Sequence, residues 1–173
     1  MFPVLSRIEG VNWEGECRYT DINLFPAPFL LRGGTRYDID KETNTVTLTS
    51  FLTFPNGKSR QVIMRGERGS LERPSMRLDP VDESGPIYMA LTELSPDTVL
   101  LNEVDRKSGK IVLTASLSLV NEGEELVQVA HEIGKSKSSE DGTTPIVEGH
   151  QVWRLKKVEA AAAGGGGGET YLP

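Results

Sequence analysis

The sequence predicts an all-β protein, an antiparallel up-and-down β-barrel of about nine to ten strands. Short runs rich in Val, Ile, Leu, Thr and Tyr recur roughly every 10 to 13 residues, with turn residues between them. Apolar and polar residues alternate within these runs, which is typical of strands that bury one face. Tight-turn residues join successive runs, and a long series of hairpins tends to curl and close, because closure removes exposed edges.

The clearest strand is expected over Lys110–Val120. One face of this strand carries only apolar residues, and the other is mostly hydroxylic. The apolar face consists of Ile111, Leu113, Ala115, Leu117 and Leu119.

Turn and breaker residues delimit the other strands. Asn56-Gly57 lies between two alternating runs and predicts a tight hairpin. Gly33-Gly34 predicts a bulge or a sharp coil within its strand, and Pro74 predicts that its strand lies at an edge. These strands are expected over Trp13–Thr20, Pro28–Ile39, Thr45–Phe54, Lys58–Arg65, Leu71–Leu78, Pro86–Leu94, Thr98–Arg106, Glu124–Ile133 and Ile146–Lys157.

Composition excludes several classes of protein. The chain has 173 residues and a net charge of −6, so it lacks the excess of cations that a nucleic-acid-binding protein needs. No run approaches the ~18 apolar residues of a membrane span, so we expect no transmembrane segment. No leader pattern is present, and we expect a chain that is either cytosolic or already processed. The single cysteine excludes an internal disulfide framework.

The domain organisation follows from a change in composition near the end of the chain. Residues 1–157 form the predicted barrel domain, and residues 158–173 form a tail rich in Ala and Gly. Glycine runs make flexible tethers, so we expect the tail to be flexible. Two alternatives stay open: a segment that orders on a partner, and a homopolymer that stands in for other residues. Residues 134–145 are expected to form a solvated loop.

The two ends of the predicted barrel carry a recognisable pair. Trp13 follows Gly10 at the start of the first strand, and Arg154 lies in the last strand. The sequence thereby resembles the lipocalin-like (calycin) superfamily, in which a cation from the last strand packs over the tryptophan of the first and closes the barrel floor. The resemblance implies that role for Trp13 and Arg154. The alternative is that Trp13 and Trp153 are ordinary core aromatic residues.

Within that superfamily, the chain resembles algal relatives of the S-type phycobiliprotein lyases over about residues 10–157. The stretches that carry the resemblance are Trp13–Tyr19, Arg36–Asp38 and Glu148–Arg154. It implies a ten-stranded barrel that carries a bilin, an open-chain tetrapyrrole, and helps to attach it to a cysteine of an antenna protein. Relatives also occur in plastids whose antennae contain no bilin. The resemblance therefore implies a plastid location, in the stroma or associated with thylakoids.

A bilin would require particular side chains. Its propionates suit arginine, which binds carboxylates in a bidentate way, and its pyrrole nitrogens suit a carboxylate. The alternative for each charged candidate is an exposed ion pair on the outer wall. The arginine candidates are Arg36, Arg60, Arg65 and Arg77, and the carboxylate candidates are Glu103 and Glu132.

The remaining reactive side chains predict neither catalysis nor a metal site. His131 and His150 are the only histidines, and with one distant cysteine they lack the spacing of a metal-ligand set. The alternation of His131 with Val127, Val129 and Ile133 favours an inward position for it, as a structural residue. Cys17 is expected to be a small core residue.

These observations leave two classes of function. The first is a non-catalytic accessory subunit or assembly factor of a photosynthetic pigment–protein complex, without a required cofactor and with protein subunits as partners. The alternative is a bilin lyase or a carrier of a tetrapyrrole or other apolar pigment. A barrel with another small ligand stays open, because fold does not fix function. The interior distinguishes them: a carrier needs a pocket of ~300 Å³ or more, whereas a scaffold fills its barrel with side chains.

Overall fold

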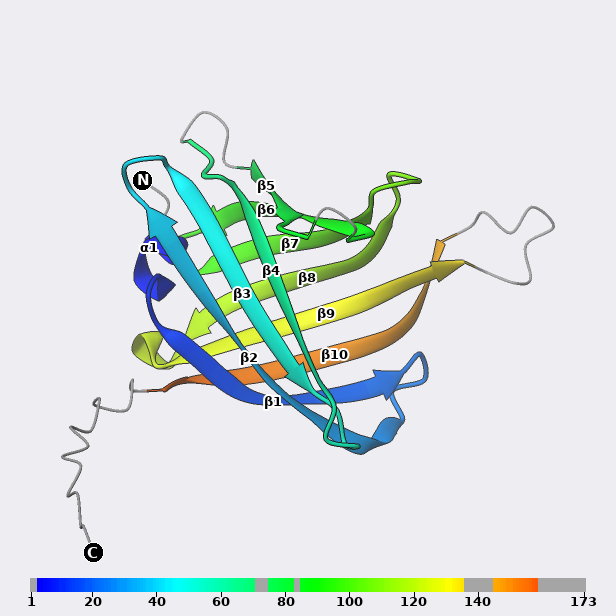
Figure 1. The fold of residues 1–173 in the computed structure, drawn as a ribbon. Helices are drawn as coiled ribbons and strands as arrows, with labels where there is room; N and C mark the ends of the chain where they lie inside the picture. Colours follow the sequence, from blue (N-terminus) through cyan, green and yellow to red (C-terminus); the bar gives the residue numbers. More distant parts are fainter. Residues whose placement is uncertain (1–2, 71–74, 83–84, 136–144, 159–173) are drawn as a thin grey trace, which may run out of the picture.

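The computed structural model describes residues 3–70, 75–82, 85–135 and 145–158, and it confirms the all-β class. Ten antiparallel strands form one closed barrel in the order β1-β10-β9-β8-β7-β6-β5-β4-β3-β2 (Figure 1). The strands are β1 Asn12–Asp21, β2 Pro26–Asp40, β3 Thr45–Thr53, β4 Ser59–Glu67, β5 Ser75–Pro80, β6 Ile87–Ser95, β7 Thr98–Asp105, β8 Ile111–Val120, β9 Glu125–Lys135 and β10 Pro145–Val158. A short 3-10 turn, Asn121–Gly123, joins β8 to β9. Of the expected tail, residues 158–173, Val158 belongs to β10 and the rest lies outside the described residues.

The first and last strands close the barrel. β1 pairs with β10 without interruption from Asn12 opposite Val158 to Asp21 opposite Gly149. The closed barrel corrects one expectation, since β5 is not an edge strand but pairs with β4 and β6. Pro74, on which that expectation rested, lies outside the described residues.

Side chains alternate between the interior and the outer wall over most of β8, as the pattern predicts. Its buried inward residues are Leu113, Ala115, Leu117 and Leu119. Ile111, which was expected on the same face, is instead 46% exposed. The pairing with β7 shifts register at this point, because Leu113 lies opposite Glu103 while Ile111 lies opposite Val104. Such an irregularity bends the strand, so Ile111 does not continue the inner face.

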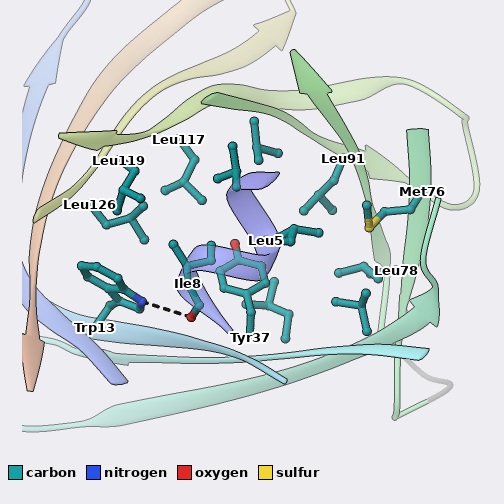
Figure 2. Packing of buried hydrophobic residues seen from close by; sticks show 14 of the residues in the cluster. Leu5, Ile8, Trp13, Tyr37, Met76, Leu78, Leu91, Leu117, Leu119 and Leu126 are labelled. Atoms are coloured by element: carbon teal, nitrogen blue, oxygen red, sulfur yellow. Dashed lines mark hydrogen bonds between the residues drawn. The ribbon is translucent and has the colours of Figure 1, made fainter. Parts of the chain in front are cut away.

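A short helix that the sequence did not predict fills one end of the barrel. Helix α1, Pro3–Ile8, begins with a proline, which suits the first helical position. Its Val4, Leu5 and Ile8 have no exposed surface and pack among the inward side chains of the strands (Figure 2). The indole Nε1 of Trp13 donates to the carbonyl of Ile8 over 3.4 Å. The helix and the indole therefore plug this end.

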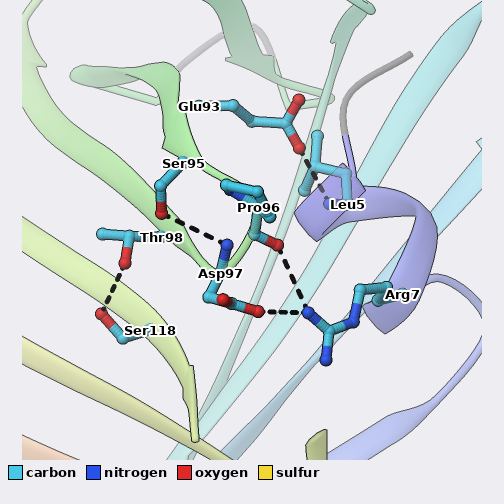
Figure 3. A network of polar contacts seen from close by, with 8 residues as sticks. All are labelled: Leu5, Arg7, Glu93, Ser95, Pro96, Asp97, Thr98 and Ser118. Carbon is cyan, nitrogen blue, oxygen red and sulfur yellow. Dashed lines mark hydrogen bonds and ion pairs between the residues drawn. The ribbon is translucent and has the colours of Figure 1, made fainter.

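Polar contacts fix α1 to β6 and to the turn between β6 and β7 (Figure 3). The backbone N–H of Leu5 donates to Glu93 Oε1 over 2.9 Å. The Arg7 guanidinium pairs with Asp97 and also reaches the carbonyl of Pro96 at 3.4 Å. Burial raises the pKa of Glu93, and the Leu5 N–H opposes that rise. The plug is thus held by contacts from distant parts of the chain.

The paired glycines of β2 do not form the expected bulge. Pairing with β1 and β3 runs through Gly33 and Gly34 in continuous register. A Cβ at Gly33 would lie 2.4 Å from the carbonyl oxygen of Phe51 and 3.1 Å from the Trp153 ring, and one at Gly34 would lie 2.4 Å from the carbonyl oxygen of Trp13 and 2.6 Å from the Phe51 ring. These positions therefore lack room for a Cβ, because neighbouring carbonyl groups and aromatic rings approach the backbone closely.

Candidate functional site

The end of the barrel opposite α1 is hollow. A cavity of about 310 Å³ lies there, which is within the range of small-molecule sites. Its floor is formed by Tyr37, Leu48, Met64 and Leu155, which also belong to the core around α1. The plugged end therefore supports the base of the cavity.

The cavity continues towards the turns at the open end. Leu52 and Gln151 line both the cavity and an outer hollow. That hollow is also lined by Phe29 of β2 and by Phe54 and Pro55 of the turn between β3 and β4. A ligand longer than the inner cavity could thus extend between aromatic side chains at the mouth.

Glu132 holds a chain of hydrogen bonds at the inner wall. Its Oε2 accepts from the Tyr19 hydroxyl over 2.9 Å, and its Oε1 accepts from Gln151 Nε2 over 2.5 Å. The side-chain carbonyl of Gln151 in turn accepts from Trp153 Nε1 over 3.2 Å. Both oxygens of Glu132 therefore already have donors, and the carboxylate raises the pKa of the Tyr19 hydroxyl that bonds to it.

Glu103 has a different environment. It lines the cavity from β7, and within the described ranges its carboxyl group makes no hydrogen bond or ion pair. Burial raises the pKa of Glu103, the charge of Glu132 raises it further, and Arg60 opposes the rise. Glu103 is therefore a carboxyl group that faces the cavity with its hydrogen-bonding capacity unused.

The six charged candidates divide between the two faces of the barrel. Arg60 lines the cavity, as Glu103 does, and Glu132 lines the outer hollow. The other three arginines lie on strand positions between inward residues and bond to polar groups of the outer wall. Arg36 bonds to Asp38 at 2.8 Å, Arg65 to Thr47 at 3.3 Å, and Arg77 to Asp79 at 2.6 Å.

The cation over the first tryptophan is Lys157 and not Arg154. Lys157 pairs with Trp13 across β1 and β10, and its Nζ lies 5.9 Å from the ring centroid. Arg154 pairs with Glu16 in register, is 67% exposed and bonds to Glu125 at 3.0 Å. The two cations are an odd number of positions apart along β10, so they point to opposite faces of the strand.

The two histidines lie on the outer wall, which corrects the inward position expected for His131. Its neighbours Ala130 and Glu132 occupy inward positions, because Ala130 is fully buried and Glu132 lines the outer hollow. His131 pairs with His150 across β9 and β10, and their Nδ1 atoms lie 2.8 Å apart.

Sequence reasoning missed several residues of the cavity. Tyr19, Gln128, Gln151 and Trp153 all reach the interior from positions that alternate with outward residues. The available signal was the presence of polar residues at alternate positions along a strand. To recognise these positions as inward, one must know the register of the strand with its neighbours. No group of three or more His, Cys, Asp or Glu able to hold a metal ion occurs in the part of the chain that the structure describes.

The comparisons with known proteins add little to this picture. No family model matches the chain, and no curated protein matches it. Among solved structures, EF1p2_mFAP2b bound to DFHBI has 13% identity and a TM-score of 0.46, and the match covers 91% of this chain and 99% of that one. A likeness at this level carries no argument about function. Within the described ranges, no helix is both long and apolar enough to span a membrane.

Proposed function

We propose that the protein binds a small, flat and largely apolar molecule that carries N–H groups, in the hollow half of the barrel. The observation that carries the proposal is the cavity of about 310 Å³ with one unpartnered carboxyl group facing it, among the residues that the structure describes. A barrel that served only as a scaffold would fill this space with side chains. Apolar walls with a few polar groups are typical of ligand sites.

The polar groups suggest how such a ligand is oriented. Glu103 accepts hydrogen bonds from N–H groups, since the carboxyl group has no other donor in the described residues. Arg60 is exposed near the mouth, where it suits a carboxylate of the ligand. Trp153 offers an aromatic surface within the cavity. An open-chain tetrapyrrole has pyrrole N–H groups, carboxylates and flat conjugated rings, which suit Glu103, Arg60 and Trp153 in turn. The sequence resemblance implies the same class of ligand.

A titration with phycoerythrobilin tests this proposal. We expect a saturable, red-shifted absorption band with one bilin per chain. Glu103→Gln weakens binding by about tenfold or more, since a hydrogen bond to a charged group is lost. Glu16→Gln is the matched control, because Glu16 lies on the outer wall and is 51% exposed. Equal affinity in both variants, or no saturable band in the unsubstituted protein, would contradict the proposal.

A second candidate is the accessory role in a photosynthetic pigment–protein complex. The observation that favours it is the apolar turn between β1 and β2, where Ile22, Leu24 and Phe25 are 54%, 67% and 69% exposed. Exposed apolar clusters are typical of protein contacts. We expect the chain to co-purify with a photosystem or antenna complex from plastids, and Leu24→Ser with Phe25→Ser to abolish this. Leu94→Ser, at a residue 60% exposed at the other end, is the control.

A further inference from the structure

We propose that His131 and His150 form a binding site for Cu²⁺ on the outer wall of the barrel. The site is independent of the cavity, because both side chains project from the outer face of β9 and β10. The two residues are direct cross-strand partners, so the sheet itself fixes their separation. They are 19 positions apart in the sequence, which explains why spacing along the chain gave no metal signal.

The distance between the two imidazoles fits a particular coordination geometry. Their Nδ1 atoms lie 2.8 Å apart. Two nitrogen ligands in adjacent corners of a square-planar ion, each about 2.0 Å from the metal, lie about 2.8 Å apart. A tetrahedral ion needs a separation of about 3.3 Å. The geometry therefore favours a tetragonal ion, and Cu²⁺ binds nitrogen ligands most strongly among divalent ions of the first transition row.

A third group adjoins the pair. Thr20 pairs with His150 across β1 and β10, and its hydroxyl is buried without a hydrogen-bond partner in the described residues. A buried hydroxyl without a partner is unfavourable. A water molecule on the metal would supply the missing partner. Both histidines are half-buried, so the remaining coordination positions stay open to water.

Binding requires a small rearrangement of protons and rings. In the hydrogen-bonded pair, the Nδ1–H of one ring donates a hydrogen bond to the Nδ1 lone pair of the other. With Cu²⁺ bound, both Nδ1 atoms carry lone pairs directed at the metal, and both Nε2 atoms carry the protons. The ring torsions of histidine are soft enough to allow this change. The two rings cross at 88° in an edge-on contact.

The test is a Cu²⁺ titration of the full, tag-free chain. Calorimetry measures the affinity and stoichiometry, and electron paramagnetic resonance identifies the ligands. We expect one ion per chain with coupling to two imidazole nitrogens. His131→Asn and His150→Asn each weaken binding by about tenfold or more. Thr20→Val, which removes only the hydroxyl, weakens binding less. Copper bound at the chain terminus would be unaffected by either histidine substitution, and that result would overturn the proposal.

A second measurement needs no variant. Cu²⁺ added below one equivalent to the isotopically labelled protein should broaden the imidazole resonances of both histidines together, because the ion is paramagnetic. Broadening at one histidine alone, or at neither, would contradict a shared site. Circular dichroism of the two asparagine variants establishes that any loss of binding does not come from unfolding.

Discussion

At the scale of single residues, burial controls the chemistry of Cys17. The side chain has no exposed surface, and burial raises the pKa of its thiol to about 12. At pH 8 only about 1 in 10⁴ of such thiols is ionised, and the thiolate is the reactive form. We therefore expect a thiol reagent at pH 8 to label unfolded protein rapidly and native protein only as it unfolds. Fast labelling of the native chain would show that Cys17 is accessible.

Glu103 is expected to cost stability at neutral pH. Its pKa is raised in the folded state, so folding is favoured while the group is protonated and this advantage is lost as pH rises through the folded pKa. Glu103→Gln should stabilise the protein at pH 7 by on the order of 1 kcal/mol and have little effect below about pH 4. Urea unfolding at both pH values measures this, with Glu16→Gln as control. A destabilised variant at pH 7 would contradict the account.

The sequence could predict only in part which charged residues line the cavity. Glu103 and Arg60 were identified by residue type, whereas Arg36, Arg65 and Arg77 proved to be outward. The role of Lys157 was missed, because the register between β1 and β10 decides whether its side chain lies on the same face of the sheet as Trp13. A one-residue change in register exchanges the two faces of a strand, and no local pattern fixes register between the ends of the chain.

At the scale of elements, α1 carries a large share of the packing for its length. Leu5 has no exposed surface, so Leu5→Ala should destabilise the protein by about 2–5 kcal/mol. Leu94→Ala, at a residue 60% exposed, should change stability by less than about 0.5 kcal/mol. Thermal and urea unfolding compare the two variants. Equal effects would show that the helix does not plug the barrel in solution.

The strands were predictable and the helix was not, for a physical reason. Sustained alternation identified strands such as β3 and β8 nearly to their ends. Helix α1 has only six residues, too few to show a helical period. It is stabilised by contacts with β6 and the turn that follows it rather than by its own sequence.

At the scale of the whole molecule, the two ends of the barrel are packed differently. The end around α1 is packed with large apolar side chains, and the other end keeps a cavity with polar groups on its walls. A cavity costs stability that packing would otherwise provide. The packed end offsets this cost, and the open end holds the cavity in which we propose that a ligand binds. Composition predicted neither the cavity nor its position, because both depend on which inward positions face one another.

The hollow end of the barrel is expected to take up a ligand. The most direct measurement is a phycoerythrobilin titration of Val62→Trp and Ile63→Trp. Val62 lines the cavity, whereas Ile63, the next residue of β4, is 40% exposed on the outer wall. We predict that Ile63→Trp binds bilin like the unsubstituted protein. We predict that Val62→Trp does not bind bilin, although circular dichroism shows that it is folded. Unchanged binding in Val62→Trp would contradict the account.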